Sequence, residues 1–331
     1  MAQIFVENLV KTFRIAERQP GMVGAVQGLF HRRYRDVNAL AGISFEINAG
    51  ELVGYIGPNG AGKSTTVKTL SGILVPSSGT CVVNGRIPWK SRIEHVRNIG
   101  VVFGQRTQLW WDLPVTESFD LLRDIYSIPS NRYSESLDEL ICLLDLKPLL
   151  DTPVRQLSLG QRMRCDVAAA LLHAPPILFL DEPTIGLDAI SKLAVREFIN
   201  KINRERGVTV ILTTHDMDDI EVLCTRVIVI GGGKLLSDGS LEDLRRRVSR
   251  ERLLIVDLGS APTGEYASIQ IADAEVIKTD GARVTLRFDP GVVSTAELIA
   301  RFTAKYAVQD LFVENPPIEE IIARLYSEHA L

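Results

Sequence analysis

The sequence contains few cysteines, and none of them are grouped. Four are scattered over 331 residues without a C-x-x-C pair: Cys81, Cys142, Cys165 and Cys224. This spacing favours neither a metal site nor a disulfide framework, and it fits a reducing compartment. The chain also lacks any apolar run close to the roughly 18–20 residues that a membrane-spanning helix needs. We therefore expect that the chain cannot itself form a transmembrane pore.

The chain also lacks a strong excess of charge of either sign. Its 37 Lys and Arg residues against 41 Asp and Glu residues give a formal net charge of −4. Nucleic-acid-binding domains usually concentrate basic side chains on one surface, so we expect no nucleic-acid partner. A length of 331 residues with 46% hydrophobic composition is enough for one large domain and one small domain.

A glycine-rich run with the pattern G-x-x-x-x-G-K-[ST] is the strongest motif in the chain. It consists of Gly57, Pro58, Asn59, Gly60, Ala61, Gly62, Lys63, Ser64 and Thr65. The apolar segment 51–56 before it reads as a strand and 65–70 after it as a helix, which is the context that a phosphate-binding loop requires. Backbone N–H groups of such a loop surround a β-phosphate at a helix N-terminus. Lys63 is then expected to reach the phosphates, and the Ser64 hydroxyl to bind Mg²⁺.

A pair of carboxylates follows a short apolar run farther along the chain. Residues 177–180 have the composition of a buried strand, and Asp181 and Glu182 stand at its carboxyl end, where open α/β sheets bind ligands. We expect Asp181 to hold Mg²⁺ through water and Glu182 to polarise the water that attacks the γ-phosphate. The alternative is a polar strand end before a turn at Pro183, which the nearby phosphate loop makes less attractive.

With these motifs in order, the chain resembles the ATP-binding subunits of ABC transporters over roughly residues 1–245. The further elements that carry the resemblance are Phe13, Gln105, the run Leu157-Ser158-Leu159-Gly160-Gln161, Gly186-Leu187-Asp188 and His215. The resemblance implies that Phe13 stacks on adenine, although it could equally be a core aromatic. It also implies that Gln105 senses Mg²⁺ and the attacking water, and that His215 acts beside the γ-phosphate.

The run around Ser158 matches the signature of that family, and it also has a direct physical interpretation. Ser158 is expected to cap a helix that continues through Leu171, which makes a second anion site at a helix N-terminus. The resemblance implies that Ser158, Gly160 and Gln161 contact ATP bound to a second subunit, with Asp188 crossing the interface of a head-to-tail homodimer. Leu159 stands where the family usually has glycine, so backbone freedom is lost there.

The organisation of the chain follows from these assignments. We expect an α/β P-loop NTPase fold at 1–245, the ABC ATPase core, with an antiparallel edge sheet from strands 3–10 and 42–47 and a helical subdomain at about 106–158. An insertion at about 14–37 carries Met22, Val26, Leu29 and Phe30 at helical spacing, either as an interfacial helix or as an ordinary loop. A small α+β accessory domain is expected at 250–331.

The resemblance also implies partners and a location. We expect ATP and Mg²⁺ as cofactors, a second ATPase subunit, and transmembrane permease subunits that dock near Trp110 and Trp111, unless this Trp pair is buried instead. The protein would then lie at the cytoplasmic face of the plasma (inner) membrane, attached through its permease. The accessory domain shifts the expectation towards export of a hydrophobic drug, lipid or glycan. An importer ATPase and a soluble non-transport ABC ATPase remain as alternatives.

Overall fold

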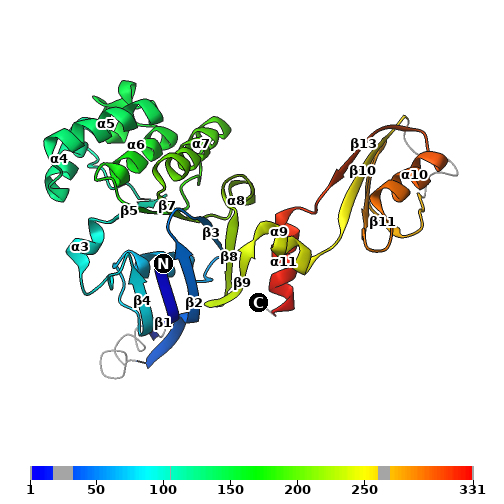
Figure 1. Cartoon of the computed structure of the whole chain (residues 1–331), viewed down its shortest axis with the longest axis horizontal. Helices are drawn as coiled ribbons and strands as arrows, with labels where there is room; N and C mark the ends of the chain where they lie inside the picture. The colour runs from blue at the N-terminus through cyan, green and yellow to red at the C-terminus, as the bar shows by residue number, and fades with distance from the viewer. Residues whose placement is uncertain (1, 18–32, 105, 260–268, 330–331) are drawn as a thin grey trace, which may run out of the picture. The chain divides into compact units, whose positions relative to one another are not determined.

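The computed structural model describes residues 2–17, 33–104, 106–259 and 269–329. The chain divides into two compact units, Met1–Leu241 and Glu242–Leu331, which we call unit 1 and unit 2 (Figure 1). Each unit has its own hydrophobic core. The domain limits that the sequence suggests, at 245–250 and at 106–158, stay predictions.

The centre of unit 1 is a six-stranded sheet with the strand order β5-β6-β7-β3-β8-β9. Its strands are β3 (Leu52–Ile56), β5 (Ile99–Phe103), β6 (Ile177–Asp181), β7 (Thr209–Thr213), β8 (Arg226–Gly231) and β9 (Lys234–Ser240). All neighbouring pairs are parallel except β8 and β9. Every residue of β3, β6 and β7 is buried, as expected of parallel strands covered on both faces. Because β6, β7 and β3 are neighbours, their carboxyl ends lie together at one edge.

Helices surround this sheet in the α/β arrangement that the sequence predicts. They are α2 (Lys63–Leu70), α3 (Arg92–Val96), α4 (Val115–Tyr126), α5 (Ser130–Leu144), α6 (Leu159–Leu171), α7 (Ala189–Arg206) and α8 (Met217–Leu223), with 3₁₀ turns at Lys147–Leu149 and Val154–Gln156. Helices α4 and α5 lie within the stretch 106–158, where the sequence predicts helical structure. Figure 1 shows α4–α7 together on one side of the sheet.

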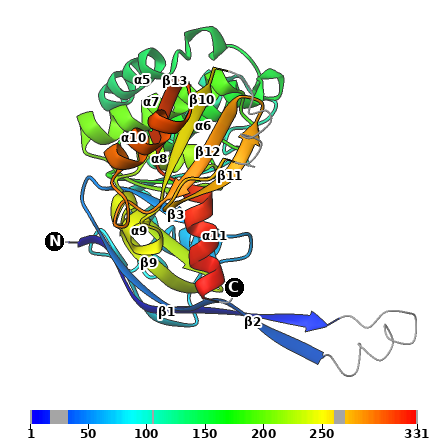
Figure 2. The same cartoon turned by 90° about the vertical axis from the view of Figure 1, so that its right-hand side faces the viewer.

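A three-stranded antiparallel sheet, in the order β2-β1-β4, forms the edge layer of unit 1. Its strands are β1 (Ala2–Glu17), β2 (Arg33–Asn48) and β4 (Ser78–Val83). β4 pairs with β1 only as far as Val10, so β1 and β2 continue from there as a two-stranded ribbon that projects from the sheet (Figure 2).

This ribbon includes both ends of the predicted insertion at 14–37, which itself stays a prediction. Residues 14–16 pair with 34–36 in regular register, so both ends of the proposed insertion are strand. The sequence did not predict this extension because charged residues in this stretch hide the alternation typical of a strand. Met22, Val26, Leu29 and Phe30 lie outside the described residues.

Unit 2 is an α+β unit, as predicted. Its antiparallel sheet has the order β11-β12-β10-β13. The elements are α9 (Leu241–Val248), β10 (Arg252–Leu258), β11 (Ala274–Asp280), β12 (Arg283–Phe288), α10 (Thr295–Lys305), β13 (Val308–Glu314) and α11 (Ile318–Glu328). Side chains of β10 and β12 share one core with Leu298 and Phe302 of α10.

The last helix, α11, has one apolar face, formed by the buried side chains of Ile318, Ile321, Ile322 and Leu325. Within the part of the chain that the structure describes, no helix combines the length and apolar character needed to cross a membrane.

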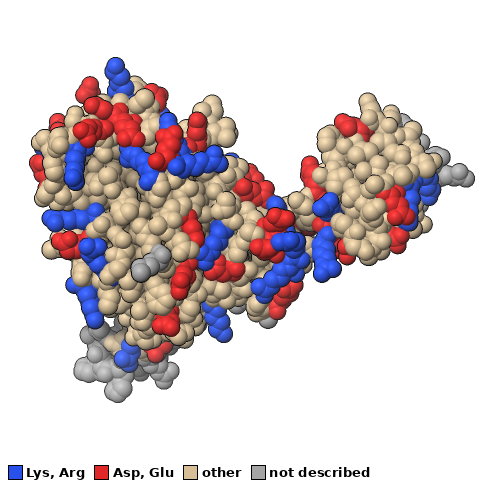
Figure 3. All heavy atoms as spheres, viewed as in Figure 1, with Lys and Arg blue, Asp and Glu red and all other residues tan. Residues whose placement is uncertain are grey.

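Cationic and anionic side chains are interspersed over the face drawn in Figure 3, which therefore carries no broad patch of one charge sign.

Candidate nucleotide-binding site

A cavity of about 470 Å³ lies at the carboxyl edge of the parallel sheet in unit 1. Its lining consists of Pro58, Asn59, Gly60, Gly62, Lys63, Ser64, Thr65, Glu182, Ile185 and His215. All of these except Ile185 are site residues that the sequence predicts. The fold thus brings the phosphate loop after β3, the carboxylate after β6 and the histidine after β7 to one place.

The loop between β3 and α2 has the backbone that phosphate binding requires. Gly62 caps α2 with a left-handed φ of +107°, and a Cβ atom there would lie 2.5 Å from the Ala39 carbonyl oxygen. Only glycine therefore fits between the loop and β2. Because α2 carries no acidic residue in its first turn, its free N–H groups and its dipole make an anion-binding end.

Lys63 is buried at this loop. Its Nζ donates to the carbonyl oxygens of Gly57 (2.6 Å) and Pro58 (3.2 Å). Burial lowers the pKa of the Lys63 ammonium, whereas the charges of Glu182 and Asp181 oppose that shift. The cation is therefore held where phosphate oxygens could replace the two carbonyls as acceptors.

Ser64 and Asp181 offer the oxygen atoms that Mg²⁺ prefers. The Ser64 hydroxyl donates to Asp181 Oδ1 at 3.3 Å, which joins the start of α2 to the end of β6. In the described ranges, no group of three or more His, Cys, Asp and Glu residues could hold a metal. This donor set fits Mg²⁺, which commonly takes one or two protein ligands and completes its shell with phosphates and waters.

Glu182 and His215 form a hydrogen-bonded pair on the cavity wall. His215 Nδ1 donates to Glu182 Oε2 at 2.5 Å, and the His215 side chain stays 63% exposed. Glu182 adopts a left-handed φ of 59°, a strained conformation that clusters at functional sites. A Cβ at Gly104 would lie 1.9 Å from the Glu182 carbonyl oxygen. Gly104, which the sequence analysis did not single out, is therefore needed for this geometry.

The predicted helix cap at Ser158 is confirmed, and it takes the form of a capping box. Ser158 Oγ accepts from the Gln161 backbone N–H at 3.3 Å, and Gln161 Oε1 accepts from the Ser158 N–H at 2.9 Å. A Cβ at Gly160 would lie 2.4 Å from Ser191 Oγ, so this glycine allows α6 to pack closely against α7. The Leu159 side chain lies against Gly186.

Several predicted site residues do not line the cavity of this chain. Ser158, Gly160 and Gln161 belong to the N-terminus of α6, and Asp188 caps α7 by accepting from the Ser191 N–H and hydroxyl at 2.9 Å each. These hydrogen bonds lower the pKa of Asp188. Phe13 is half-buried on β1, with Lys11 Nζ 5.2 Å from the centre of its ring. Gln105 lies outside the described residues.

A buried carboxylate that sequence reasoning missed ties α6 to the segment after β5. Asp166 Oδ1 accepts from the Thr107 hydroxyl (2.8 Å) and the Gln108 N–H (3.0 Å). Burial raises the pKa of Asp166 to about 6, although these hydrogen bonds oppose the shift. The available signal was an aspartate among the apolar residues of a helix, where an unpartnered carboxylate would be costly.

A second missed carboxylate, Asp219 of α8, is fully buried. It accepts from the hydroxyls of Thr184 and Thr214 and from Arg196 Nε at 2.5 Å. Thr184 follows Glu182 closely, and Thr214 precedes His215. Asp219 therefore connects the two loops that carry the Glu182–His215 pair.

The Trp pair after β5 stays exposed, so the alternative of a buried pair is wrong. Trp110 and Trp111 are 38% and 50% exposed. The Arg162 guanidinium of α6 lies 5.5 Å from the Trp111 ring centre, a cation–π distance. An aromatic surface is thus joined to the helix that begins at Ser158.

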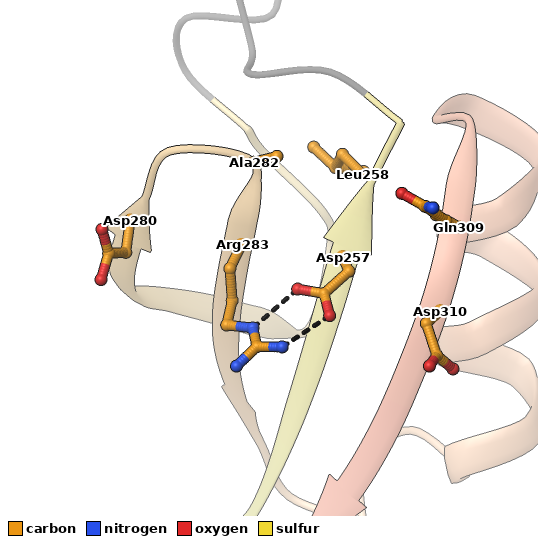
Figure 4. A pocket seen from close by; sticks show the side chains of 7 residues that line it. All are labelled: Asp257, Leu258, Asp280, Ala282, Arg283, Gln309 and Asp310. Atoms are coloured by element: carbon orange, nitrogen blue, oxygen red, sulfur yellow. Dashed lines mark hydrogen bonds and ion pairs between the residues drawn. The ribbon is translucent and has the colours of Figure 1, made fainter.

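Unit 2 contains a larger cavity, of about 600 Å³, at the end of its sheet (Figure 4). Asp257 and Arg283 face each other there in a two-point ion pair, with both N–O distances 2.6 Å. Asp280 and Asp310 add further carboxylates to the lining. Among its described lining residues this cavity has no glycine-rich loop or helix N-terminus, and its arginine is already paired. The cavity in unit 1 is therefore the candidate nucleotide-binding site.

Comparison with known proteins agrees with this geometry. The family model for ABC transporters matches residues 40–185. The linearmycin resistance ATP-binding protein LnrL of Bacillus subtilis (strain 168) is 32% identical over 299 residues, 89% of this chain and 95% of LnrL. The methionine import ATP-binding protein MetN of Latilactobacillus sakei subsp. sakei (strain 23K) is 28% identical over 89% of this chain and 86% of MetN.

One relative is considerably longer than the region it shares with this chain. The probable multidrug ABC transporter ATP-binding protein YbhF of Escherichia coli (strain K12) is 35% identical over 72% of this chain, and the match spans 40% of YbhF. A solved structure, the dimeric post-hydrolysis state of the ATP-binding cassette MJ0796 bound to ADP and Pi, has a TM-score of 0.60 and 25% identity over 72% of this chain and 98% of that chain. The chain therefore belongs to the ATP-binding proteins of ABC transporters, and it is an ATP hydrolase with an α/β P-loop fold.

Proposed function

We propose that this protein is the ATPase subunit of an ABC exporter and drives separate transmembrane permease subunits. The observation that carries the proposal is the division of the nucleotide machinery between two places. The first place is the cavity that contains Lys63 and Glu182. The second is the capped N-terminus of α6, which does not line that cavity.

This division is what a head-to-tail homodimer would use. Each ATP, with Mg²⁺ at Ser64 and Asp181, would lie between the phosphate loop of one copy and Ser158, Gly160 and Gln161 of the other. A C2 arrangement then gives two equal sites, because each copy contributes its phosphate loop to one site and its α6 N-terminus to the other. Asp188, next to Gly160 through Ser191, would stand at the interface.

The remaining site roles follow the same proposal. Phe13 on the ribbon would stack on adenine, Gln105 would contact Mg²⁺ and the attacking water, and Glu182 would act as the general base. His215, hydrogen-bonded to Glu182 through Nδ1, would face the γ-phosphate with its other nitrogen.

The surface around Trp110 and Trp111 is the proposed contact with the permease. Exposed aromatic side chains are typical anchors of protein interfaces, and Arg162 and Asp166 connect this surface to α6. The protein would then sit peripherally at the cytoplasmic face of the plasma membrane.

The names of the relatives support export. LnrL, a resistance protein, matches over 95% of its own length, and YbhF is named as a probable multidrug protein. An importer ATPase is the second candidate, because MetN matches over 86% of its length.

The test is affinity isolation of the full chain from gentle detergent extracts, with and without ATP. Co-isolation of integral membrane proteins that lack an ATPase domain, and that change the ATPase rate, is the expected result. Recovery of an external substrate-binding protein with them would favour the importer. Recovery of ribosomes or nucleic acid without membrane proteins would contradict the transporter assignment.

A further inference from the structure

We infer that Thr213 is a positioning residue for the magnesium-binding carboxylate, Asp181. The inference rests on the proposed metal site at Ser64 and Asp181, and it does not depend on the transported substrate or on the direction of transport. It gives a role to a side chain that no motif of the sequence includes.

The strand register delivers Thr213 to Asp181. β6 and β7 are parallel neighbours, and Asp181 pairs with Thr213 at their carboxyl ends. Thr213 Oγ1 donates to Asp181 Oδ1 at 2.5 Å, the length of a hydrogen bond between a hydroxyl and a carboxylate. The Thr213 side chain is fully buried, and its branched Cβ restricts χ1. The donor is therefore held in one position before any metal binds.

A hydroxyl at this position needs a specific reason. The three residues before it in β7, Val210, Ile211 and Leu212, are buried apolar side chains. Valine has nearly the same shape as threonine and would bury without the cost of a hydroxyl group. The acceptor that compensates this cost is Asp181.

The pattern of contacts on Asp181 suggests what the hydroxyl does. Both Thr213 and Ser64 reach the same oxygen, Oδ1, and no hydrogen bond to Oδ2 occurs within the described parts of the chain. With Oδ1 fixed by Thr213, Oδ2 is the atom left to accept from a metal-bound water. Groups that hydrogen-bond to a metal's ligands orient them, and their removal commonly costs about 10–100-fold in metal affinity.

The experiment is a Mg²⁺ titration of full-length protein with a fluorescent, non-hydrolysable ATP analogue, so that binding is read without turnover. Thr213→Val should raise the Mg²⁺ concentration for half-maximal tight binding by about tenfold and leave analogue binding in EDTA unchanged. Thr213→Ser, which keeps the hydroxyl, should restore the wild-type Mg²⁺ dependence.

The matched control is Thr209→Val, at the other end of the same strand. Thr209 is also fully buried, but its hydroxyl bonds the Gly50 N–H and the Gln3 side chain. This variant should keep the wild-type Mg²⁺ dependence even if it unfolds more easily.

Two results would overturn the inference. One is a Thr213→Val protein with the wild-type Mg²⁺ dependence, and the other is an equal loss of binding with Mg²⁺ and in EDTA, which would make the hydroxyl purely structural. If analogue binding to the wild-type protein did not depend on Mg²⁺, the proposed metal site itself would be contradicted, and the inference with it.

Discussion

Of the two cavities, the one in unit 2 has the larger volume, but the one in unit 1 is better equipped to bind a nucleotide. The cavity in unit 2 has a volume of about 600 Å³, against about 470 Å³ in unit 1. Its cationic side chain, Arg283, already forms an ion pair with Asp257. The smaller cavity has Lys63 on backbone carbonyls, a helix N-terminus, and Glu182 beside His215. The candidate site is therefore distinguished by the charged and hydrogen-bonding groups that a ligand can contact, and not by the volume of its cavity.

The largest expected effect is on hydrolysis in unit 1. Glu182→Gln keeps the shape of the side chain but removes the proposed base, so ATP turnover should fall by about 10²–10⁴-fold. ATP binding should persist, and a dimer should accumulate with ATP and Mg²⁺. Steady-state ATPase assays and size-exclusion chromatography measure the two results. A variant with normal turnover would remove Glu182 from this role.

The next largest effect is on ATP affinity. Lys63→Ala removes a buried cation from the phosphate loop, and we expect an affinity loss of about 100-fold, in line with the cost of truncating a buried charged partner. Equilibrium binding of labelled ATP measures it. The control is Lys68→Ala, an exposed lysine in the last turn of α2, which should bind like the wild type. Equal affinities in all three proteins would contradict the proposed phosphate contact.

A smaller effect is expected at Asp166 and depends on pH. Its pKa is raised in the folded chain to about 6, so its protonated form contributes stability that is complete below the unfolded pKa and is lost as pH rises through about 6. Asp166→Asn imitates the protonated form. Relative to the wild type, it should gain about 3 kcal/mol of unfolding free energy as pH rises from the unfolded pKa through about 6.

Urea unfolding followed by tryptophan fluorescence reports on unit 1, because Trp89, Trp110 and Trp111 all belong to it. Measurements on both sides of pH 6 give the difference, and Asp138→Asn, an exposed carboxylate on α5, serves as the control. A constant difference between Asp166→Asn and wild type across pH would contradict the assignment.

The smallest effect is expected in unit 2. Arg283→Ala removes the cation of the larger cavity, just as Lys63→Ala removes that of the smaller one. ATP affinity and turnover should stay at wild-type values, because this exposed guanidinium forms an ion pair with Asp257 and is not among the described residues that line the nucleotide cavity of unit 1. A fall in ATP affinity would break the comparison between the two cavities.

Much of the fold and site could be predicted because the motifs are local. The phosphate loop fixes β3 and α2, and the apolar run before Asp181 fixes β6, so their meeting at one sheet edge follows from the topology of parallel sheets. The roles of Thr213, Asp166 and Asp219 could not be predicted in this way. Their partners are distant in sequence, and each depends on strand register or helix packing that no short pattern specifies.

The ribbon of β1 and β2 was missed for another reason. Its outer residues pair in a two-stranded arrangement with polar side chains on both strands, including Arg14 opposite Asp36. Such a segment lacks the period-2 apolar pattern by which a half-buried strand is predicted.

Photoaffinity labelling of the full-length protein with 8-azido-ATP tests the location of the ATP site most directly. After digestion, the label should fall on unit 1 peptides near Phe13 and the phosphate loop, should be competed by ATP, and should be lost in Lys63→Ala. ATP-competed label on the unit 2 strands that carry Asp257 and Arg283 would contradict the account.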